Sequence, residues 1–197
     1  MRSDDFGGDI IPESIQSHDV YGYDFDGYWE DIGTIRSFYE TNLKLTNSDS
    51  PFNFYDVKSP IYTHARFLPG SVVEDSKLED VLLAEGCRIQ KADITHSIIG
   101  IRSQVAQGTM IKDSIIMGAD YYDAEKQSGD IPIGIGRNCK IESAILDKNA
   151  RIGDNVTILS FPRDHKDVDH DLYYLRDGIV VVAKDTEIPS GTKIAPE

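Results

Sequence analysis

The sequence predicts a mainly β protein whose larger part is a left-handed parallel β-helix of hexapeptide repeats. Three observations support this fold class. From about residue 68 aliphatic residues recur every five or six positions, glycine often follows them, and equivalent positions such as Ile99 and Ile116 are 17 residues apart. A helix has a period of about 3.6 residues and a half-buried strand a period of about 2, so neither produces this spacing. Short strands joined by tight turns, three to a coil, do produce it. The alternative, a two-sheet sandwich, would need the regular spacing to arise by chance.

Each short strand is expected to point one aliphatic side chain inward, where it stacks on its equivalent in the next coil. Gly100, Gly136 and Gly153 follow such residues, at corners where the backbone must turn sharply. We assign the β-helix to residues 61–197. The expected inward residues are Val73, Leu78, Leu83, Ile89, Ile94, Ile99, Val105, Ile111, Ile116, Ile135, Ile141, Leu146, Ile152, Ile158, Val182, Ile188 and Ile194.

Two polar segments interrupt the repeats and are expected to form protruding loops. They span residues 120–132 and 162–171, and the second contains four aspartates and two histidines. Insertions in solenoid proteins lie on one side of the molecule and often contact partners. The alternative for each segment is a solvated loop without a partner.

The residues before about position 60 show a different pattern. They are rich in aromatic residues, and apolar residues at i, i+3, i+4 and i+8 form one face of a predicted helix over residues 34–45. One helix cannot bury so many aromatic side chains, so residues 1–46 are interpreted as the edge of a larger domain. Residues 47–60 begin with a run of small polar residues and proline, which indicates a linker.

The composition excludes several classes of protein. The chain has 34 acidic and 20 basic residues, a net charge of −14, so no nucleic-acid partner is expected. No apolar stretch approaches the ~18 residues of a membrane span, and none follows Met1, so neither a membrane partner nor a secretory signal is expected. Two cysteines, Cys87 and Cys139, are too few for a disulfide scaffold or a four-cysteine zinc site. They fit a reducing compartment such as the cytoplasm.

Several residues can carry chemistry, and each has a plainer structural alternative. Asp31 precedes the predicted helix, where a carboxylate can ligate Mg²⁺ or cap the helix. Trp29 can form a flat wall for a sugar ring or pack in a core. His96 lies inside the coils, where it can act as the general base of an acyltransferase or be an exposed coil residue. His165 and His170 lie in the acidic loop, which lacks the fixed third ligand of a metal site.

Basic residues cluster locally against the acidic background. Four lie between positions 137 and 151, Lys148 among them, while Lys184 follows an apolar strand and Arg66 precedes the first coil. Such side chains can gather a phosphate or a carboxylate through charge-assisted hydrogen bonds. The alternative is an ordinary set of surface cations.

Six ordered motifs are spread over nearly the whole chain. They are residues 28–34 (YWEDIGT), 61–63 (IYT), 117–122 (MGADYY), 131–136 (IPIGIG), 145–153 (ILDKNARIG) and 178–184 (GIVVVAK). This set resembles glucose-1-phosphate adenylyltransferases (ADP-glucose pyrophosphorylases), most closely the cyanobacterial and plant type. It covers only the C-terminal half of such an enzyme, and the nucleotide-binding loop of that family has no counterpart here.

The resemblance implies a fold, a reaction and site residues. The left-handed β-helix, a regulatory and oligomerisation domain, would follow the C-terminal remnant of an α/β nucleotidyltransferase domain. The family converts ATP and glucose 1-phosphate to ADP-glucose and pyrophosphate, for glycogen or starch synthesis. By resemblance Asp31 binds Mg²⁺ and Trp29 lies beside the sugar. Arg66, Lys148 and Lys184 match residues that bind the allosteric effectors 3-phosphoglycerate and inorganic phosphate.

The resemblance also implies homo- or hetero-tetramers in the bacterial cytoplasm or, alternatively, the plastid. By this reading the chain alone is inactive. Residues 64–66 and the segment between Lys148 and Lys184 depart from the family pattern, which bears on the identity of the effector. Two other functions remain open: a non-catalytic β-helix that assembles related subunits, and a hexapeptide acyltransferase that uses His96.

Overall fold

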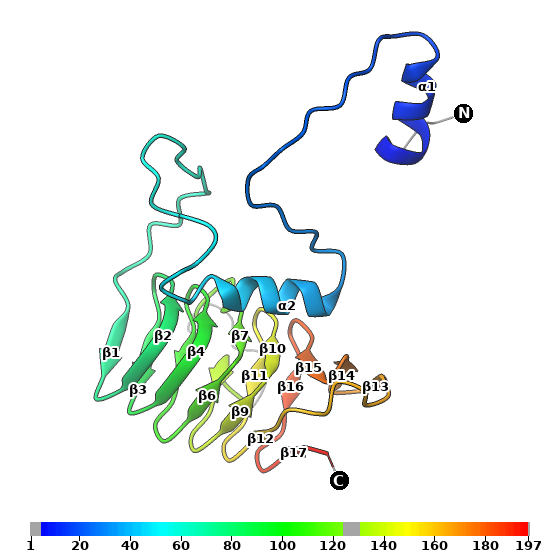
Figure 1. Ribbon diagram of the computed structural model, residues 1–197. Helices are drawn as coiled ribbons and strands as arrows, with labels where there is room; N and C mark the ends of the chain where they lie inside the picture. The colour runs from blue at the N-terminus through cyan, green and yellow to red at the C-terminus, as the bar shows by residue number, and fades with distance from the viewer. Residues whose placement is uncertain (1–4, 124–130, 197) are drawn as a thin grey trace.

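The computed structural model describes residues 5–123 and 131–196, and its strands wind into a β-helix with a helix along one side (Figure 1). A π-helical turn (Phe6–Ile10), α1 (Ile11–Ile15) and α2 (Ile35–Lys44) precede the strands. The strands are β1 (Val72–Glu74), β2 (Lys77–Leu83), β3 (Arg88–Gln90), β4 (Asp93–Ile99), β5 (Gln104–Val105), β6 (Met110–Lys112), β7 (Ile115–Ile116), β8 (Gly134–Ile135), β9 (Lys140–Glu142), β10 (Ala144–Leu146), β11 (Arg151–Ile152), β12 (Thr157–Ile158), β13 (Val168–His170), β14 (Tyr173–Arg176), β15 (Ile179–Val182), β16 (Glu187–Ile188) and β17 (Lys193–Ile194).

Parallel pairing between successive coils builds the β-helix. One face is a six-stranded sheet in the order β1-β3-β5-β8-β11-β16. The other two faces belong to one larger sheet, because β2 and β4 each bend from one face to the next at a residue with positive φ, Asp80 and His96. The register keeps aliphatic residues in line, since Ile111 pairs with Ile94 on one side and Ile141 on the other. The prediction of a mainly β, parallel β-helix is confirmed.

The core is the column of inward-pointing aliphatic side chains. All of the predicted inward residues from Ile89 to Ile194 are buried, and Leu78 and Leu83 pack partly buried against them. The prediction is wrong for Val73, which is 42% exposed. Val73 lies on β1, which pairs on one side only, so no described coil covers it.

The corners between strands use residues that tolerate a positive φ. Glycine lacks the Cβ that clashes in this region, and Asn and Asp adopt it more readily than other residues do. A positive φ recurs at equivalent positions of successive coils, which are 16 or 17 residues apart except where an insertion intervenes. At the corner after the six-stranded sheet the positive-φ residues are Asp75, Lys91, Gly108, Asn138, Asn155 and Gly191.

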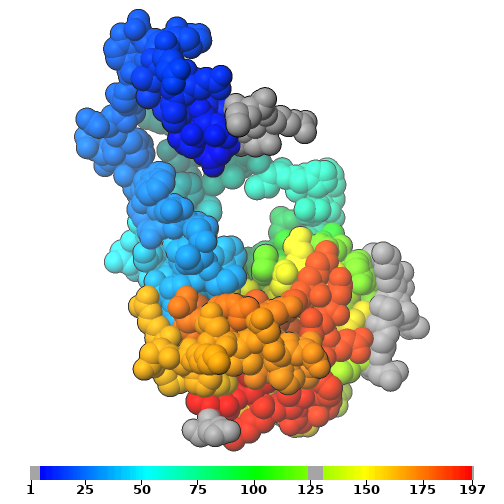
Figure 2. Space-filling view, turned by 90° about the vertical axis from the view of Figure 1, so that its right-hand side faces the viewer, coloured from blue at the N-terminus to red at the C-terminus, as the bar shows by residue number. Residues whose placement is uncertain are grey.

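Two insertions lengthen the regular coils. The first follows β7, and of the loop predicted over residues 120–132 the part 124–130 lies outside the described residues. The second contains β13 and β14, which pair antiparallel and continue the larger sheet beyond β15. This hairpin forms the orange layer turned toward the viewer in Figure 2. The loop predicted over 162–171 is therefore wrong for residues 168–170, which form β13.

The helix predicted over residues 34–45 is present as α2 and packs on the outer face of the larger sheet. Thr34 caps it, since its side chain accepts the backbone N–H of Ser37. Tyr39 and Leu43 are buried against the sheet, and the Tyr39 hydroxyl donates to the Asp113 carbonyl at 2.5 Å. The β-helix therefore buries one face of a helix interpreted from sequence as the edge of another domain. The outward sheet residues beneath α2 are Ile98, Ile115, Ile145, Ile179 and Val181.

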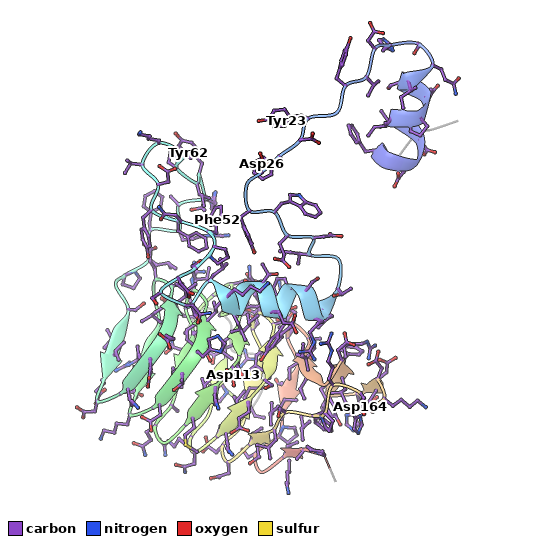
Figure 3. All side chains as sticks on the ribbon, viewed as in Figure 1. Tyr23, Asp26, Phe52, Tyr62, Asp113 and Asp164 are labelled. Atoms are coloured by element: carbon purple, nitrogen blue, oxygen red, sulfur yellow. The ribbon has the colours of Figure 1, made fainter. Side chains whose placement is uncertain are left out.

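Many aromatic residues before the β-helix are exposed. Tyr23 and Asp26 lie along an extended stretch ahead of α2, while Phe52 and Tyr62 lie in the connection from α2 to β1 (Figure 3). Tyr23 is 89% and Tyr62 92% exposed.

Among the described residues, no helix has the length and apolar character that crossing a membrane requires.

Candidate functional site

Two turns at one corner of the β-helix carry the predicted effector lysines. Lys148 follows β10 and Lys184 follows β15, and these strands pair in parallel, so the turns belong to adjacent coils. The Asp185 N–H donates to the Lys148 carbonyl at 3.1 Å, which holds the turns in register. The fold thus brings together two lysines that are far apart in sequence.

Asp120 joins the two ammonium groups. Its Oδ1 lies 3.1 Å from the Lys148 Nζ, and its Oδ2 lies 2.7 Å from the Lys184 Nζ. The three side chains are between 32% and 49% exposed. The ion pairs are therefore formed at the surface, where a ligand from solution can reach them.

A buried amide positions Asp120. Asn149 is only 2% exposed, and its Oδ1 accepts the Asp120 backbone N–H at 2.8 Å. Its Nδ2 donates to Asp120 Oδ2 at 3.3 Å and to Asp185 Oδ1 at 2.8 Å. Because both polar atoms of this amide are bonded, its orientation is fixed, and with it the place of Asp120 on the corner.

Asp120 and Lys184 stabilise each other's charged forms. The hydrogen bond from Lys184, with help from Lys148, lowers the pKa of Asp120 to about 2 against a smaller opposing effect of burial. The Asp120 carboxylate in turn raises the pKa of Lys184. The pKa shifts of Asp120 and Lys184 therefore both favour the charged forms that make this ion pair.

Arg66 lies toward the other end of the same corner. It lines a hollow of about 630 Å³ together with Glu85 and Ile101. Backbone hydrogen bonds link successive coils along this corner. The N–H groups of Ala119, Asn149 and Asp185 donate to the carbonyls of Ile101, Gly118 and Lys148, respectively. Since strands of adjacent coils are about 4.8 Å apart, the Ile101 position is roughly 10 Å from that of Lys148 along the axis. The structure places Arg66 near this row, without a contact to either lysine in the described residues.

Two other basic residues between positions 137 and 151, Lys140 and Arg151, pair with carboxylates outside this site. Lys140 pairs with Glu142 at 3.0 Å. Arg151 is buried, with its guanidinium 2.9 Å from Asp123 Oδ1 and donating to the Ile131 carbonyl at 2.6 Å. Because these two cations have partners elsewhere, the local positive charge seen in the sequence is not one ligand site.

Asp31 and Trp29 lie in the extended stretch ahead of α2. Trp29 is 73% exposed, and Asp31 is exposed as well. Over residues 5–123 and 131–196, no three His, Cys, Asp or Glu side chains gather in a way that can hold a metal ion. One exposed carboxylate does not make a Mg²⁺ site, so the described residues do not by themselves fit this cofactor.

Three of the histidines, His96, His165 and His170, contact neighbouring side chains. His96 Nδ1 lies 2.6 Å from Asp113 Oδ1, at the corner next to α2. His170 at the end of β13 stacks on Tyr173, and His165, which precedes β13, packs edge-on against Phe161. Neither of these two histidines belongs to a metal cluster among the described residues.

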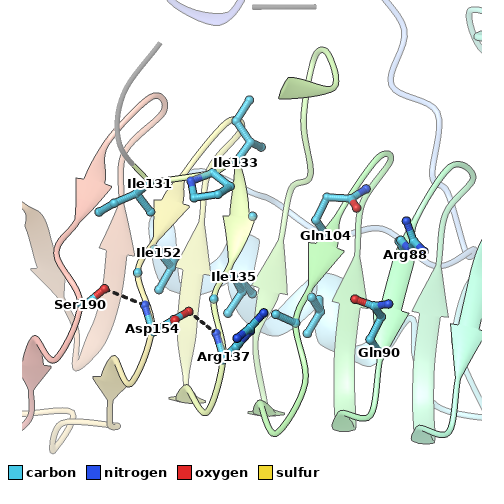
Figure 4. Close-up of a pocket in the computed structure, with 16 residues that line it drawn as sticks. Arg88, Gln90, Gln104, Ile131, Ile133, Ile135, Arg137, Ile152, Asp154 and Ser190 are labelled. Carbon is cyan, nitrogen blue, oxygen red and sulfur yellow. Dashed lines mark hydrogen bonds between the residues drawn. The ribbon is translucent and has the colours of Figure 1, made fainter. Parts of the chain in front are cut away.

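A hollow of about 510 Å³ lies on the outer face of the six-stranded sheet (Figure 4). Arg88 and Gln104 line it from one side and Ile133 from another. At its end the Asp154 carboxylate accepts the Arg137 backbone N–H at 2.7 Å (Figure 4). The predicted site residues are not among those that line it in the described part of the chain.

Sequence reasoning missed Asp120 and Asn149 as site residues. Both lie within motifs that carry the resemblance, residues 117–122 and 145–153, but their charge and burial gave no reason to pair them. They are 29 residues apart, and only the coil register makes them neighbours. The sequence signal for Asn149 was its place in the run 147–149 (Asp-Lys-Asn), which is typical of a turn. Asparagine suits the positive φ that Asn149 adopts in this turn.

Comparisons with known proteins agree with this geometry. A family model described as the GLGC left-handed parallel beta-helix domain matches residues 66–193, and a nucleotidyl transferase model matches residues 1–48. The chain is 46% identical to the glucose-1-phosphate adenylyltransferase small subunit, chloroplastic/amyloplastic, of Triticum aestivum. The alignment covers 98% of this chain and 42% of that protein, so the chain spans about two-fifths of the length of this curated relative. The left-handed β-helix is confirmed, and the chain belongs to the glucose-1-phosphate adenylyltransferase family, whose GLGC β-helix domain it carries.

Proposed function

We propose that this chain is the C-terminal regulatory part of a glucose-1-phosphate adenylyltransferase and binds phosphorylated effectors at Lys148 and Lys184. One observation carries the proposal: the fold places these two ammonium groups on either side of a single carboxylate, Asp120. Two lysines so close together suit a ligand that bears phosphate and carboxylate groups, such as 3-phosphoglycerate. Inorganic phosphate is the simplest competitor.

The catalytic part of the proposal concerns the whole enzyme. ATP and glucose 1-phosphate are its proposed substrates, and ADP-glucose for starch or glycogen synthesis is its proposed product. Asp31 and Trp29 are proposed to contribute a Mg²⁺ ligand and a wall of the sugar site, together with residues beyond the described part of the chain. Arg66 is proposed to contact an effector anion from the other end of the corner.

The proposal includes assembly into a homo- or hetero-tetramer. It also includes a plastid location, which is supported by the name of the wheat relative, or a bacterial cytoplasmic one. An effector that binds one conformation of the assembled subunits better than another shifts the assembly toward that conformation.

Calorimetric titration of the chain with inorganic phosphate and with 3-phosphoglycerate tests the effector site. Lys184→Gln removes one ammonium group and is expected to weaken binding at least roughly tenfold, since each charge-assisted contact is worth about 1.5–3 kcal/mol. Lys193→Gln on β17 removes the same charge from an exposed position on another face and is the matched control. Equal affinities for the parent and the Lys184 variant would contradict the proposal.

A further inference from the structure

The proposed effector site already holds an anion that belongs to the chain. Each carboxylate oxygen of Asp120 faces one ammonium group, Lys148 at 3.1 Å and Lys184 at 2.7 Å. An oxygen of a phosphate or carboxylate ligand would contact the same ammonium protons at the same distances. A bound ligand and Asp120 therefore compete for one pair of cations.

The local charge makes this competition important. Besides Asp120, the side chains of Asp147 and Asp185 lie close enough to act electrostatically on Lys184. With Asp120 in place, two lysines face three aspartates, in a chain whose net charge is −14. The mean field of the site then opposes an incoming anion. Moving the Asp120 carboxylate away removes the negative charge nearest to the two ammonium groups and leaves both of them free to bind a ligand.

The corner permits this movement without unfolding. The Asp120 backbone is anchored on Asn149 and follows a tight turn at Gly118, where φ is +84° and a Cβ would lie 2.0 Å from the Ile101 carbonyl oxygen. The main chain is thus fixed, while the Asp120 side chain is 35% exposed. Rotation about its side-chain bonds separates the carboxylate from the lysines and also breaks its 3.3 Å hydrogen bond from Asn149 Nδ2.

We propose that Asp120 is an internal counter-ion which an incoming phosphate ester must displace, and that this exchange sets the affinity and the selectivity of the site. The inference rests on the proposed function, because it assumes that anions bind at Lys148 and Lys184. A monoanion such as acetate only replaces the single charge of Asp120. A phosphate dianion, and still more a phosphate ester that carries a carboxylate, brings more charge than it displaces. Asp120 therefore discriminates against simple monoanions.

The test removes the charge of Asp120 and keeps its shape. The parent chain, Asp120→Asn and Asp185→Asn are titrated calorimetrically with inorganic phosphate and with acetate. In Asp120→Asn the phosphate Kd is expected to fall roughly fivefold or more, and acetate binding is expected to become measurable. Asp185→Asn removes a neighbouring charge whose carboxylate bonds Asn149. It is expected to change the phosphate Kd by less than about twofold.

Three outcomes overturn the inference. They are unchanged or weaker phosphate binding in Asp120→Asn, equal gains in both variants, and no gain in acetate binding. Lys184→Gln separates the two proposals: if it abolishes phosphate binding while Asp120→Asn has no effect, the effector site stands and displacement fails. If Lys184→Gln changes nothing, the effector site itself fails. Asp120→Ser repeats the test should Asp120→Asn not fold, and failure of both to fold would assign Asp120 a structural role instead.

Discussion

The packing of α2 on the β-helix predicts a large local effect of Leu43→Ala. Leu43 is 5% exposed, and it packs with Tyr39 against the outward side chains of Ile115 and Ile145. Truncating a buried leucine to alanine costs about 2–5 kcal/mol, because the lost contacts leave a cavity. The sheet beneath α2 is held by its own coil hydrogen bonds, so the cost falls on the docking of the helix. About 3 kcal/mol corresponds to a rise of roughly 100-fold in the undocked population.

Limited trypsin digestion measures that population. Cleavage after Arg36 and Lys44, which flank the packed face, needs α2 to leave the sheet, so its rate tracks the undocked fraction when docking is fast. The expected result is cleavage about 100-fold faster in Leu43→Ala, with an unchanged circular dichroism signal from the β-helix. Ile35→Ala lies on the same helix, but Ile35 is 39% exposed, so it should accelerate cleavage only slightly. Equal rates in the two variants would refute the inference that Leu43 holds the helix in place.

Three further predictions concern Asp120, Gly118 and Arg151. Because the pKa of Asp120 is lowered to about 2, its stabilisation is complete above the unfolded value of 3.8 and is lost as the pH falls toward 2. Allowing for solvent screening, the free energy of unfolding is expected to fall by about 1 kcal/mol through this group. Urea unfolding between pH 5 and 2 should show this contribution in the parent chain and not in Asp120→Asn. Gly118→Ala places a Cβ 2.0 Å from the Ile101 carbonyl oxygen at a positive φ, so a loss of at least about 2 kcal/mol is expected in thermal unfolding; an unchanged Tm would contradict this. Arg151→Met leaves the Asp123 carboxylate without its cation, and a cost of about 3 kcal/mol is expected in urea unfolding, while a neutral result would show that the pair contributes nothing.

The spacing of the aliphatic residues predicts the β-helix because it is dictated by the geometry of the coil. A residue such as Ile141 is buried only if its equivalents Ile111 and Ile158 lie in line with it, and the register of β6, β9 and β12 confirms that they do. The prediction fails at Val73, because spacing gives the periodicity but not the coil at which stacking begins.

The hairpin of β13 and β14 was missed because its charged composition suggested a solvated loop. A sequence signal for β14 was the Asp177-Gly178 pair, whose positive φ values suit the two-residue turn that joins this strand to β15. Arg176 is placed beside Asp169 within this hairpin, so part of the charge pairs internally. Composition alone does not distinguish such paired charges from solvated ones.

The sequence predicts part of the candidate site. Local charge singles out Lys148 and Lys184 and the resemblance gives them an effector role, but spacing alone could not bring them together, because the inserted hairpin separates them in sequence. Asp120, which contacts both, was not predicted, since a contact across coils depends on register and on the length of each insertion.

The surface on which α2 packs and the two lysines of the candidate site are positioned by the same two strands, β10 and β15. Ile145 in β10 and Ile179 and Val181 in β15 lie beneath the helix, while Lys148 and Lys184 follow these strands directly. From Ile145 to Lys148 is three residues, a distance of roughly 10 Å along the chain. Each of these strands therefore connects a turn of the candidate site to the outer surface on which α2 packs. A shift of either turn is expected to move that surface, and with it α2 and residues 5–34, which lead into that helix.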